Sequence, residues 1–187
     1  ADVTDLTLIG DFLTANAFDM TAVGAGTAIV SGSGSIQAGG PMNLDATDLT
    51  INGWVVGDSV NLNTSGNAIR LAGNINGHNG LVDIRRPVEL TGDAILSSVN
   101  GDIAFGGDVS GAHALKANAD NGTVAFGATV GGGADPTGLT VHADSLILSG
   151  QVDIAGDIDL NVDHATFAAG SGTISTASGS NGSIDFG

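Results

Sequence analysis

The sequence predicts an all-β protein folded as a right-handed parallel β-helix (β-solenoid) of about 20 residues per turn. Three observations predict it: a repeated phrase, short runs of alternating apolar residues, and punctuation rich in Gly, Asn and Asp. Asn100–Gly106 recurs at 121–127 and 181–187, with a degenerate copy at 79–84. The copies start 21, 21 and 60 residues apart, close to one, one and three turns. A globular sandwich has no reason to repeat at this spacing, whereas a stacked coil does.

The repeated phrase predicts where each of its residues lies within a turn. Asn100-Gly101 suits a corner, because both residue types tolerate positive φ. Ile103 and Phe105 are two residues apart and share one face, which we expect to be the interior. On the next turn, about 4.8 Å away, they should stack against Val124 and Phe126. The polar third position of each copy should face outward.

Period-2 alternation between turn residues predicts the remaining strands. In chain order they lie at Leu6–Leu8, Leu49–Ile51, Val60–Leu62, Val88–Leu90, Leu139–Val141, Leu146–Leu148 and Ile158–Val162. The segment 10–23 is the best helix candidate, but its apolar residues are surrounded by Thr, Asn and Gly, which predicts strand and loop. The Gly-rich stretch 131–136 predicts turns of unequal length there.

Composition narrows the function classes. The 187 residues include 31 Gly and no Cys, which excludes a disulfide framework, a thiolate metal site and a Cys nucleophile. The net charge of −16 comes from 19 Asp and a single Glu. Asp favours turns, so the acidity fits a turn-rich strand protein. The strong cations are Arg70, Arg85, Arg86 and Lys116, with no basic patch, so nucleic acid is not an expected partner.

The two ends of the sequence suggest a segment of something longer. No run approaches the roughly 18 apolar residues of a membrane-spanning helix, so the chain is not expected to span a membrane. Its first residues lack the basic and apolar regions of a signal peptide. It stops at Phe186-Gly187, in mid-phrase. We expect residues 1–187 to form a single continuous β-solenoid segment excised from a larger protein.

The run from Leu90 through Asn100–Gly107 to Val130-Gly131-Gly132 resembles the shafts of large secreted bacterial surface proteins. It is similar to filamentous haemagglutinin-like adhesins and autotransporter passenger repeats, best from about residue 79 onward. The resemblance implies a right-handed β-helix exported across a Gram-negative outer membrane to act as a stalk or adhesive fibre. The Asn-Pro-Asn-Gly signature of that family's secretion region is absent, which implies that this segment belongs to the shaft and not to the secretion region. The resemblance carries over no catalytic residues.

Three residues are candidates for binding. Trp54 is the only Trp. In Asn52–Gly57, a weak copy of the repeated phrase, it occupies the outward position that Asp102 has in the phrase. An exposed Trp can stack on a sugar or contact a neighbouring molecule. Trp54 would instead be buried if this alignment were shifted or if a loop covered it. Arg85 and Arg86 form the sole cationic pair. They can bridge to Asp83 or Glu89, or serve a partner.

For the other titratable residues, a functional role competes with a simple position at the solvated surface. Asp157 and Asp159 share a strand face and would suit acid–base chemistry on a sugar. Asp83 could pair in the same way with Asp102 or Asp108 on the next turn. The alternative is that all of these carboxylates are solvated outer-face or corner residues. We expect no dedicated cofactor, although the many carboxylates allow incidental Ca2+ binding. The histidines, expected at the surface or at corners, are His78, His113, His142 and His164.

The sequence favours a non-catalytic structural shaft or adhesive segment of a secreted bacterial surface or fibre protein, extracellular on the cell surface. Its expected partners are a host or neighbouring-cell surface, a polysaccharide, or a second copy joined end to end. Two alternatives stay open: a carbohydrate-active β-helix enzyme and a self-assembling filament subunit, whose open strand edges would pair.

Overall fold

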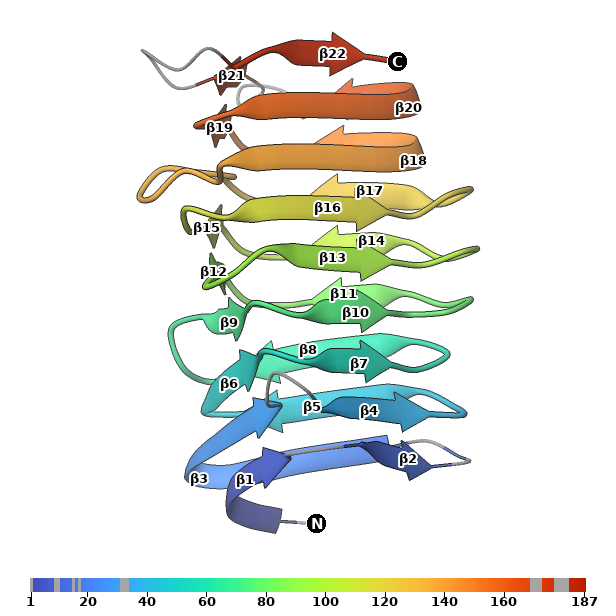
Figure 1. The fold of residues 1–187 in the computed structure, drawn as a ribbon, viewed down its shortest axis with the longest axis vertical. Coiled ribbons are helices and arrows are strands. Elements are labelled where there is room, and N and C mark those ends of the chain that lie inside the picture. Colours follow the sequence, from blue (N-terminus) through green and yellow to red (C-terminus); the bar gives the residue numbers. More distant parts are fainter. Residues whose placement is uncertain are drawn as a thin grey trace.

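The structure, a computed structural model, describes residues 2–8, 11–14, 16, 18–30, 34–168, 173–176 and 182–187. Within them the chain forms strands and no helix. The strands stack in parallel as a β-solenoid of about 7 turns with about 21 residues per turn, which confirms the predicted fold. In Figure 1 the chain runs rightward along the front strands, returns along the back strands and climbs one level, so the coil is right-handed.

Three faces, called A, B and C, surround the interior. Face A, at the front of Figure 1, stacks β2 (Phe12–Thr14), β4 (Ser35–Ala38), β7 (Trp54–Val56), β10 (Asn74–Asn76), β13 (Ala94–Ser97), β16 (Ala114–Asn118), the first parts of β18 (Gly138–Leu148) and β20 (Asp157–Phe167), and β22 (Ile184–Phe186). Face B stacks the first part of β3 (Phe18–Val30), β5 (Met42–Ala46), β8 (Val60–Thr64), β11 (Val82–Ile84), β14 (Ile103–Phe105), β17 (Thr123–Phe126), and the second parts of β18 and β20.

Face C closes each turn with shorter strands. It stacks β1 (Asp2–Leu8), the end of β3, β6 (Asp48–Ile51), β9 (Ile69–Leu71), β12 (Val88–Leu90), β15 (Val109–Ser110), the bridge residue Val130, β19 (Val152–Ile154) and β21 (Ile174–Thr176). The segment 10–23 contains β2 and the start of β3 in its described part, so the prediction of strand and loop there is confirmed.

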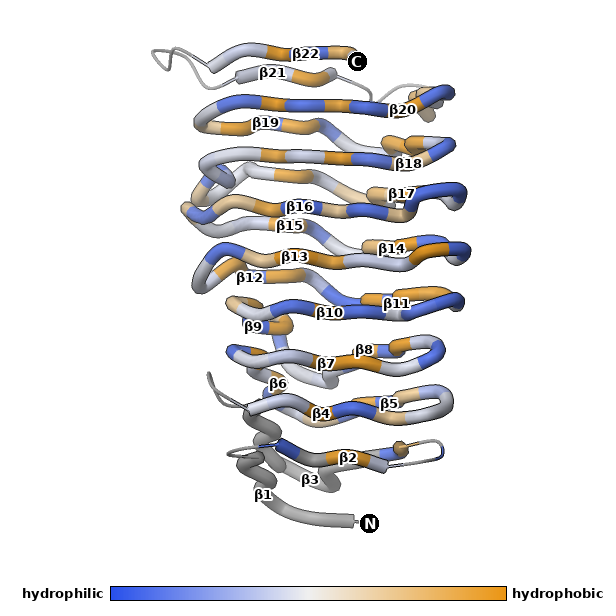
Figure 2. The backbone as a smooth tube through the Cα atoms, turned by 45° about the vertical axis from the view of Figure 1, so that its right-hand side comes forward, coloured by the Kyte–Doolittle hydropathy of each residue, from blue (hydrophilic) through white to orange (hydrophobic). Residues whose placement is uncertain are grey.

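Equivalent residues of successive turns form columns, and the inward columns make the core. On face A the column holds Ile36, Val55, Ile75, Leu96, Ala117, Val141 and Leu160, all buried. Each apolar residue covers the one below, and burial stabilises the stack by about 25 cal/mol per Å2. Figure 2 shows hydrophobic residues recurring along the strands and hydrophilic residues gathered at the corner that joins faces A and B.

The repeated phrase lies where its pattern predicts on face B. Ile103 pairs with Val124 and Phe105 with Phe126, and all four side chains are buried. The two Phe rings are stacked, with centroids 4.8 Å apart and planes 7° apart. The degenerate copy at 79–84 is also in phase, because Val82 pairs with Ile103.

The spacing of about three turns predicts that the last copy of the phrase stacks above the earlier copies, and that prediction is wrong. Ile184 and Phe186 pair with Ile158 and Leu160 on face A, not with the continuation of the Phe126 column on face B. The cause is unequal turn length. Paired residues are 21 apart from Leu96 to Ala117, but 24 from Ala117 to Val141, 19 to Leu160 and 26 to Phe186. The 24-residue turn contains the Gly-rich stretch 131–136, as predicted.

The corner glycine is required for a different reason from the one predicted. Gly101 does not have a positive φ, and the positive-φ residues near these corners are His78 and Asp120. Instead, Gly101 stacks directly on Gly80, and a Cβ built on Gly101 would lie 2.3 Å from the Gly80 carbonyl oxygen. Gly122 repeats the relation one turn above, with its Cβ position 2.3 Å from the oxygen of Gly101. Close backbone stacking therefore selects glycine at this corner.

Candidate functional site

Trp54 projects outward from the first position of β7 on face A. Its side chain is 55% exposed, so the predicted outward orientation is confirmed. The phrase alignment that suggested it is wrong, however, because Asn52-Gly53 forms the corner between faces C and A, whereas Asn100-Gly101 joins A to B. The column neighbours of Trp54 are Ser35 on β4 and Asn74 on β10. Its ring therefore rests on small and polar side chains.

A groove of about 600 Å3 lies where β2, β4 and β7 end, and Val56 but not Trp54 is among the residues that line it. Its wall on face A is the column Leu13, Gln37 and Val56, and its corner wall includes Asp58 and His78. Val56 is two residues beyond Trp54 and points to the same side. The groove draws on several turns of the coil, so sequence reasoning missed it.

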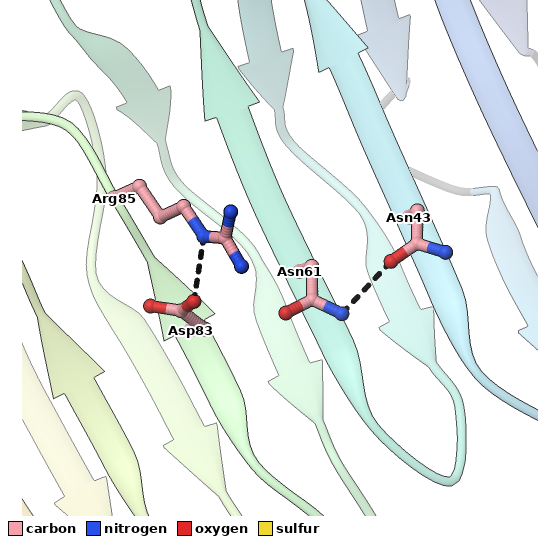
Figure 3. A network of polar contacts seen from close by, with 4 residues as sticks. All are labelled: Asn43, Asn61, Asp83 and Arg85. Atoms are coloured by element: carbon pink, nitrogen blue, oxygen red, sulfur yellow. Dashed lines mark hydrogen bonds and ion pairs between the residues drawn. The ribbon is translucent and has the colours of Figure 1, made fainter.

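Arg85 and Arg86 follow β11 at the corner between faces B and C. Figure 3 shows the Arg85 guanidinium turned back to Asp83, with Nε 2.7 Å from the carboxylate, so the predicted bridge is confirmed. Both partners contact solvent, and such pairs contribute little to stability. To their right in the same figure, the Asn61 amide donates to Asn43 over 2.8 Å, which ties β8 to β5.

The two arginines differ in what they can still bind. Arg86 is exposed and forms no ion pair within the described part of the chain. The nearest predicted alternative for it, Glu89, instead lies 3.6 Å from Arg70 on the neighbouring strand. Trp54 is on face A, so the structure does not bring the arginines and the Trp together into one site.

Many aspartates have a structural role that sequence reasoning missed. Asp93, Asp102 and Asp108 each precede a strand, and each carboxylate accepts a hydrogen bond from a backbone N–H 21 residues later. The three bonds are 2.7 to 2.9 Å long. They satisfy strand-initial donors that would otherwise lack a protein partner. The sequence signal for this role is an Asp that directly precedes one strand and lies one turn before the start of another.

We expect Asp102→Ala to lower the free energy of unfolding by about 1 kcal/mol, because the Thr123 N–H loses its acceptor. Asp102→Asn keeps a side-chain oxygen in place and should cost less. Urea denaturation of both variants measures the difference. Equal losses would mean that charge rather than the cross-turn hydrogen bond matters.

Asp157 and Asp159 do share the outward face of β20, as predicted, and both line a groove of about 370 Å3 that also contains Lys116. The Ser183 backbone N–H and hydroxyl both donate to one oxygen of Asp157, at 2.9 and 3.0 Å. These bonds hold the pKa of Asp157 below its ordinary value. An acid that stays ionised is a poor general acid. In the other predicted pairing, the residue directly above Asp83 is Ala104 and neither Asp102 nor Asp108.

The link between Asp157 and Ser183 should weaken in acid. Because folding lowers the pKa of Asp157, the link stabilises the fold above the ordinary Asp pKa of about 4 and is lost as pH falls through the folded value. Hydrogen exchange at the Ser183 amide, corrected for intrinsic rates, should show protection falling below about pH 4. Asp157→Asn should flatten that dependence. An unchanged profile in the variant would assign the acid response to other carboxylates.

The histidines lie at the surface or at corners, as predicted. His142 is 3.8 Å from Asp120 and His113 is 3.9 Å from Asp93. His142 also lines a hollow of about 420 Å3 that includes Asp144 and Asp163. Among the described residues, no group of three or more His, Asp or Glu side chains is arranged to hold a metal ion. Incidental Ca2+ binding stays a prediction.

The fold defines a class, a β-solenoid repeat protein. No family model, curated protein or solved structure matches the chain. The described residues contain no helix long and apolar enough to cross a membrane.

Proposed function

We propose that this chain is a shaft or adhesive segment of a large secreted bacterial surface or fibre protein, and that it carries out no catalysis. The supporting observation is the continuity of the core. On face A, every inward residue from Ile36 on β4 to Leu160 on β20 pairs with the turn above or below. Parallel ladders on all three faces join the same turns. Such a stack holds its two ends a fixed distance apart, which is what a shaft does.

The outer surface fits the same role. Cross-turn bonds from Asp93, Asp102 and Asp108 use carboxylates to brace neighbouring turns. The whole chain carries a net charge of −16, which keeps an extended surface soluble through self-repulsion. Asp93, Asp102 and Asp108 therefore have a structural role that needs no substrate.

Two experiments test the proposal. Antibodies raised against the purified chain should label intact cells of the source organism, and labelling only after permeabilisation would contradict an extracellular location. Incubation with acidic and neutral polysaccharides should release no new reducing ends. Turnover that survives repurification and disappears in Asp157→Asn or Asp159→Asn would instead establish the carbohydrate-active enzyme.

End-to-end association is a second candidate, favoured by the last rung of face A. Ile184 and Phe186 continue inward columns above Ile158 and Leu160, yet they are 39% and 61% exposed. Exposed apolar residues beside a strand edge that has no partner among the described residues invite pairing with another chain. Electron microscopy at high concentration should then show filaments. Monomers alone would count against self-assembly and leave the shaft proposal standing.

A further inference from the structure

The surface around Trp54 on face A is formed by uncharged residues. We call it the Trp54 surface: Trp54, Val56, Leu13, Gln37 and Asn74. Leu13, Gln37 and Val56 form one column, and Trp54 lies below Asn74 in the next column. Leu13, which lines the groove, is 79% exposed, and Trp54, two residues before the lining residue Val56, is 55% exposed, so two large apolar side chains face solvent. Successive rungs are about 4.8 Å apart, so the surface presents a regular series of contacts.

Unpaired polar groups alternate with these apolar ones. The Asn74 side-chain amide has no hydrogen-bond partner among the described residues, and neither does the Asp58 carboxylate at the corner of the groove. The Gln37 amide donates to Ser35 over 3.3 Å, which leaves its oxygen free to accept. Side-chain amides can both donate to and accept from hydroxyl groups, and an ionised carboxylate accepts from them. An apolar lining with a few fixed polar groups is typical of small-ligand sites.

Charge narrows the ligand class. None of the four strong cations of the chain lines the groove: Arg70 is on β9, Arg85 and Arg86 follow β11, and Lys116 is on β16. Asp58 is the groove's carboxylate, and the whole chain carries −16. Polyanionic ligands are therefore repelled, while a neutral ligand with both apolar faces and hydroxyl groups meets no penalty.

We propose that the Trp54 surface and its groove bind a neutral oligosaccharide. The Trp54 indole stacks on the apolar face of one sugar ring, and Leu13 and Val56 cover the next part of the chain. Asn74, Gln37 and Asp58 bond the hydroxyl groups at the ring edges. Because the three groups come from different turns, an extended glycan lies across the rungs of face A. This proposal does not rest on the shaft function.

The single Trp makes the test specific, because the chain has no second Trp and no Tyr to confuse the emission. Cellohexaose, chitohexaose and mannohexaose, titrated separately into the full chain, are the neutral probes, and oligogalacturonate is the acidic one. We expect at least one neutral probe to shift Trp54 emission and to protect it from acrylamide quenching. Oligogalacturonate should do neither. No response to any neutral hexaose at millimolar concentration would overturn the proposal, as would tighter binding of oligogalacturonate.

Calorimetry of variants then locates the site. Trp54→Ala should weaken binding of the responding hexaose roughly ten-fold or more, as expected for removal of an aromatic anchor. Trp54→Phe should restore part of it, and Asn74→Ala should weaken it less. Ile147→Ala is the matched control, an exposed apolar residue of face B with 39% exposure, and should bind as the parent does. Equal affinity of Trp54→Ala and the parent would place any glycan elsewhere and overturn the proposal.

Discussion

Phe105→Ala is expected to lower the free energy of unfolding by about 3–5 kcal/mol. Phe105 is 1% exposed, lies in the column between Ile84 and Phe126, and stacks on the Phe126 ring. Truncation removes that contact and leaves a cavity that the turns above and below cannot close without breaking their ladders. Equilibrium denaturation measures the loss, and hydrogen exchange at β14 and β17 shows where it acts.

The control for Phe105→Ala is Ile147→Ala, which shortens an outward residue of the same face. Its effect should stay within about 0.5 kcal/mol. A loss near zero for Phe105→Ala, or equal losses for the two variants, would contradict the assignment of the inward face.

Gly101→Ala is expected to lower the free energy of unfolding by about 1–3 kcal/mol. The added Cβ would lie 2.3 Å from the carbonyl oxygen and 2.4 Å from the carbonyl carbon of Gly80. Both are backbone atoms, so the clash can be relieved only by separating two turns. Thermal and urea denaturation measure the effect.

Gly133→Ala is the matched substitution, because no atom lies within 4 Å of the Cβ position at Gly133. It should change stability by less than about 0.5 kcal/mol. If both alanines were tolerated equally, close stacking of the corners would not explain the glycine ladder, and the turn spacing at this corner would be wider than the structure has it.

The fold was predictable because two regularities of different scale agree. The alternation of Ile103 and Phe105 sets the inward face, and the 21-residue spacing to Val124 and Phe126 sets the stacking. The last copy of the phrase was predicted on the wrong face. Its sequence resembles the earlier copies, but that resemblance does not determine the face once turns vary from 19 to 26 residues. Its residues still form a strand with alternating sides, but on another face.

The candidate site was predictable only residue by residue. Arg85 bridges to Asp83, as its neighbours along the chain suggest, and Trp54 is outward although the alignment that predicted this is wrong. The groove that Val56 lines and the cross-turn bonds of Asp102 depend on residues about one turn away. Those contacts follow from register, and register follows from turn length, which composition and local pattern leave open.

Cross-linking between turns tests the central claim most directly, because the chain has no native Cys. Ala104 pairs with Ala125 on the next turn, and Ala125 pairs with Ile147 on the turn after that. Cysteines at 104 and 125 should form a disulfide under mild oxidation, since paired strands lie about 4.8 Å apart, within disulfide reach. Cysteines at 104 and 147, two rungs apart, should stay reduced within the monomer. Efficient closure of the second pair, or failure of the first in a folded protein, would contradict the stacked β-solenoid.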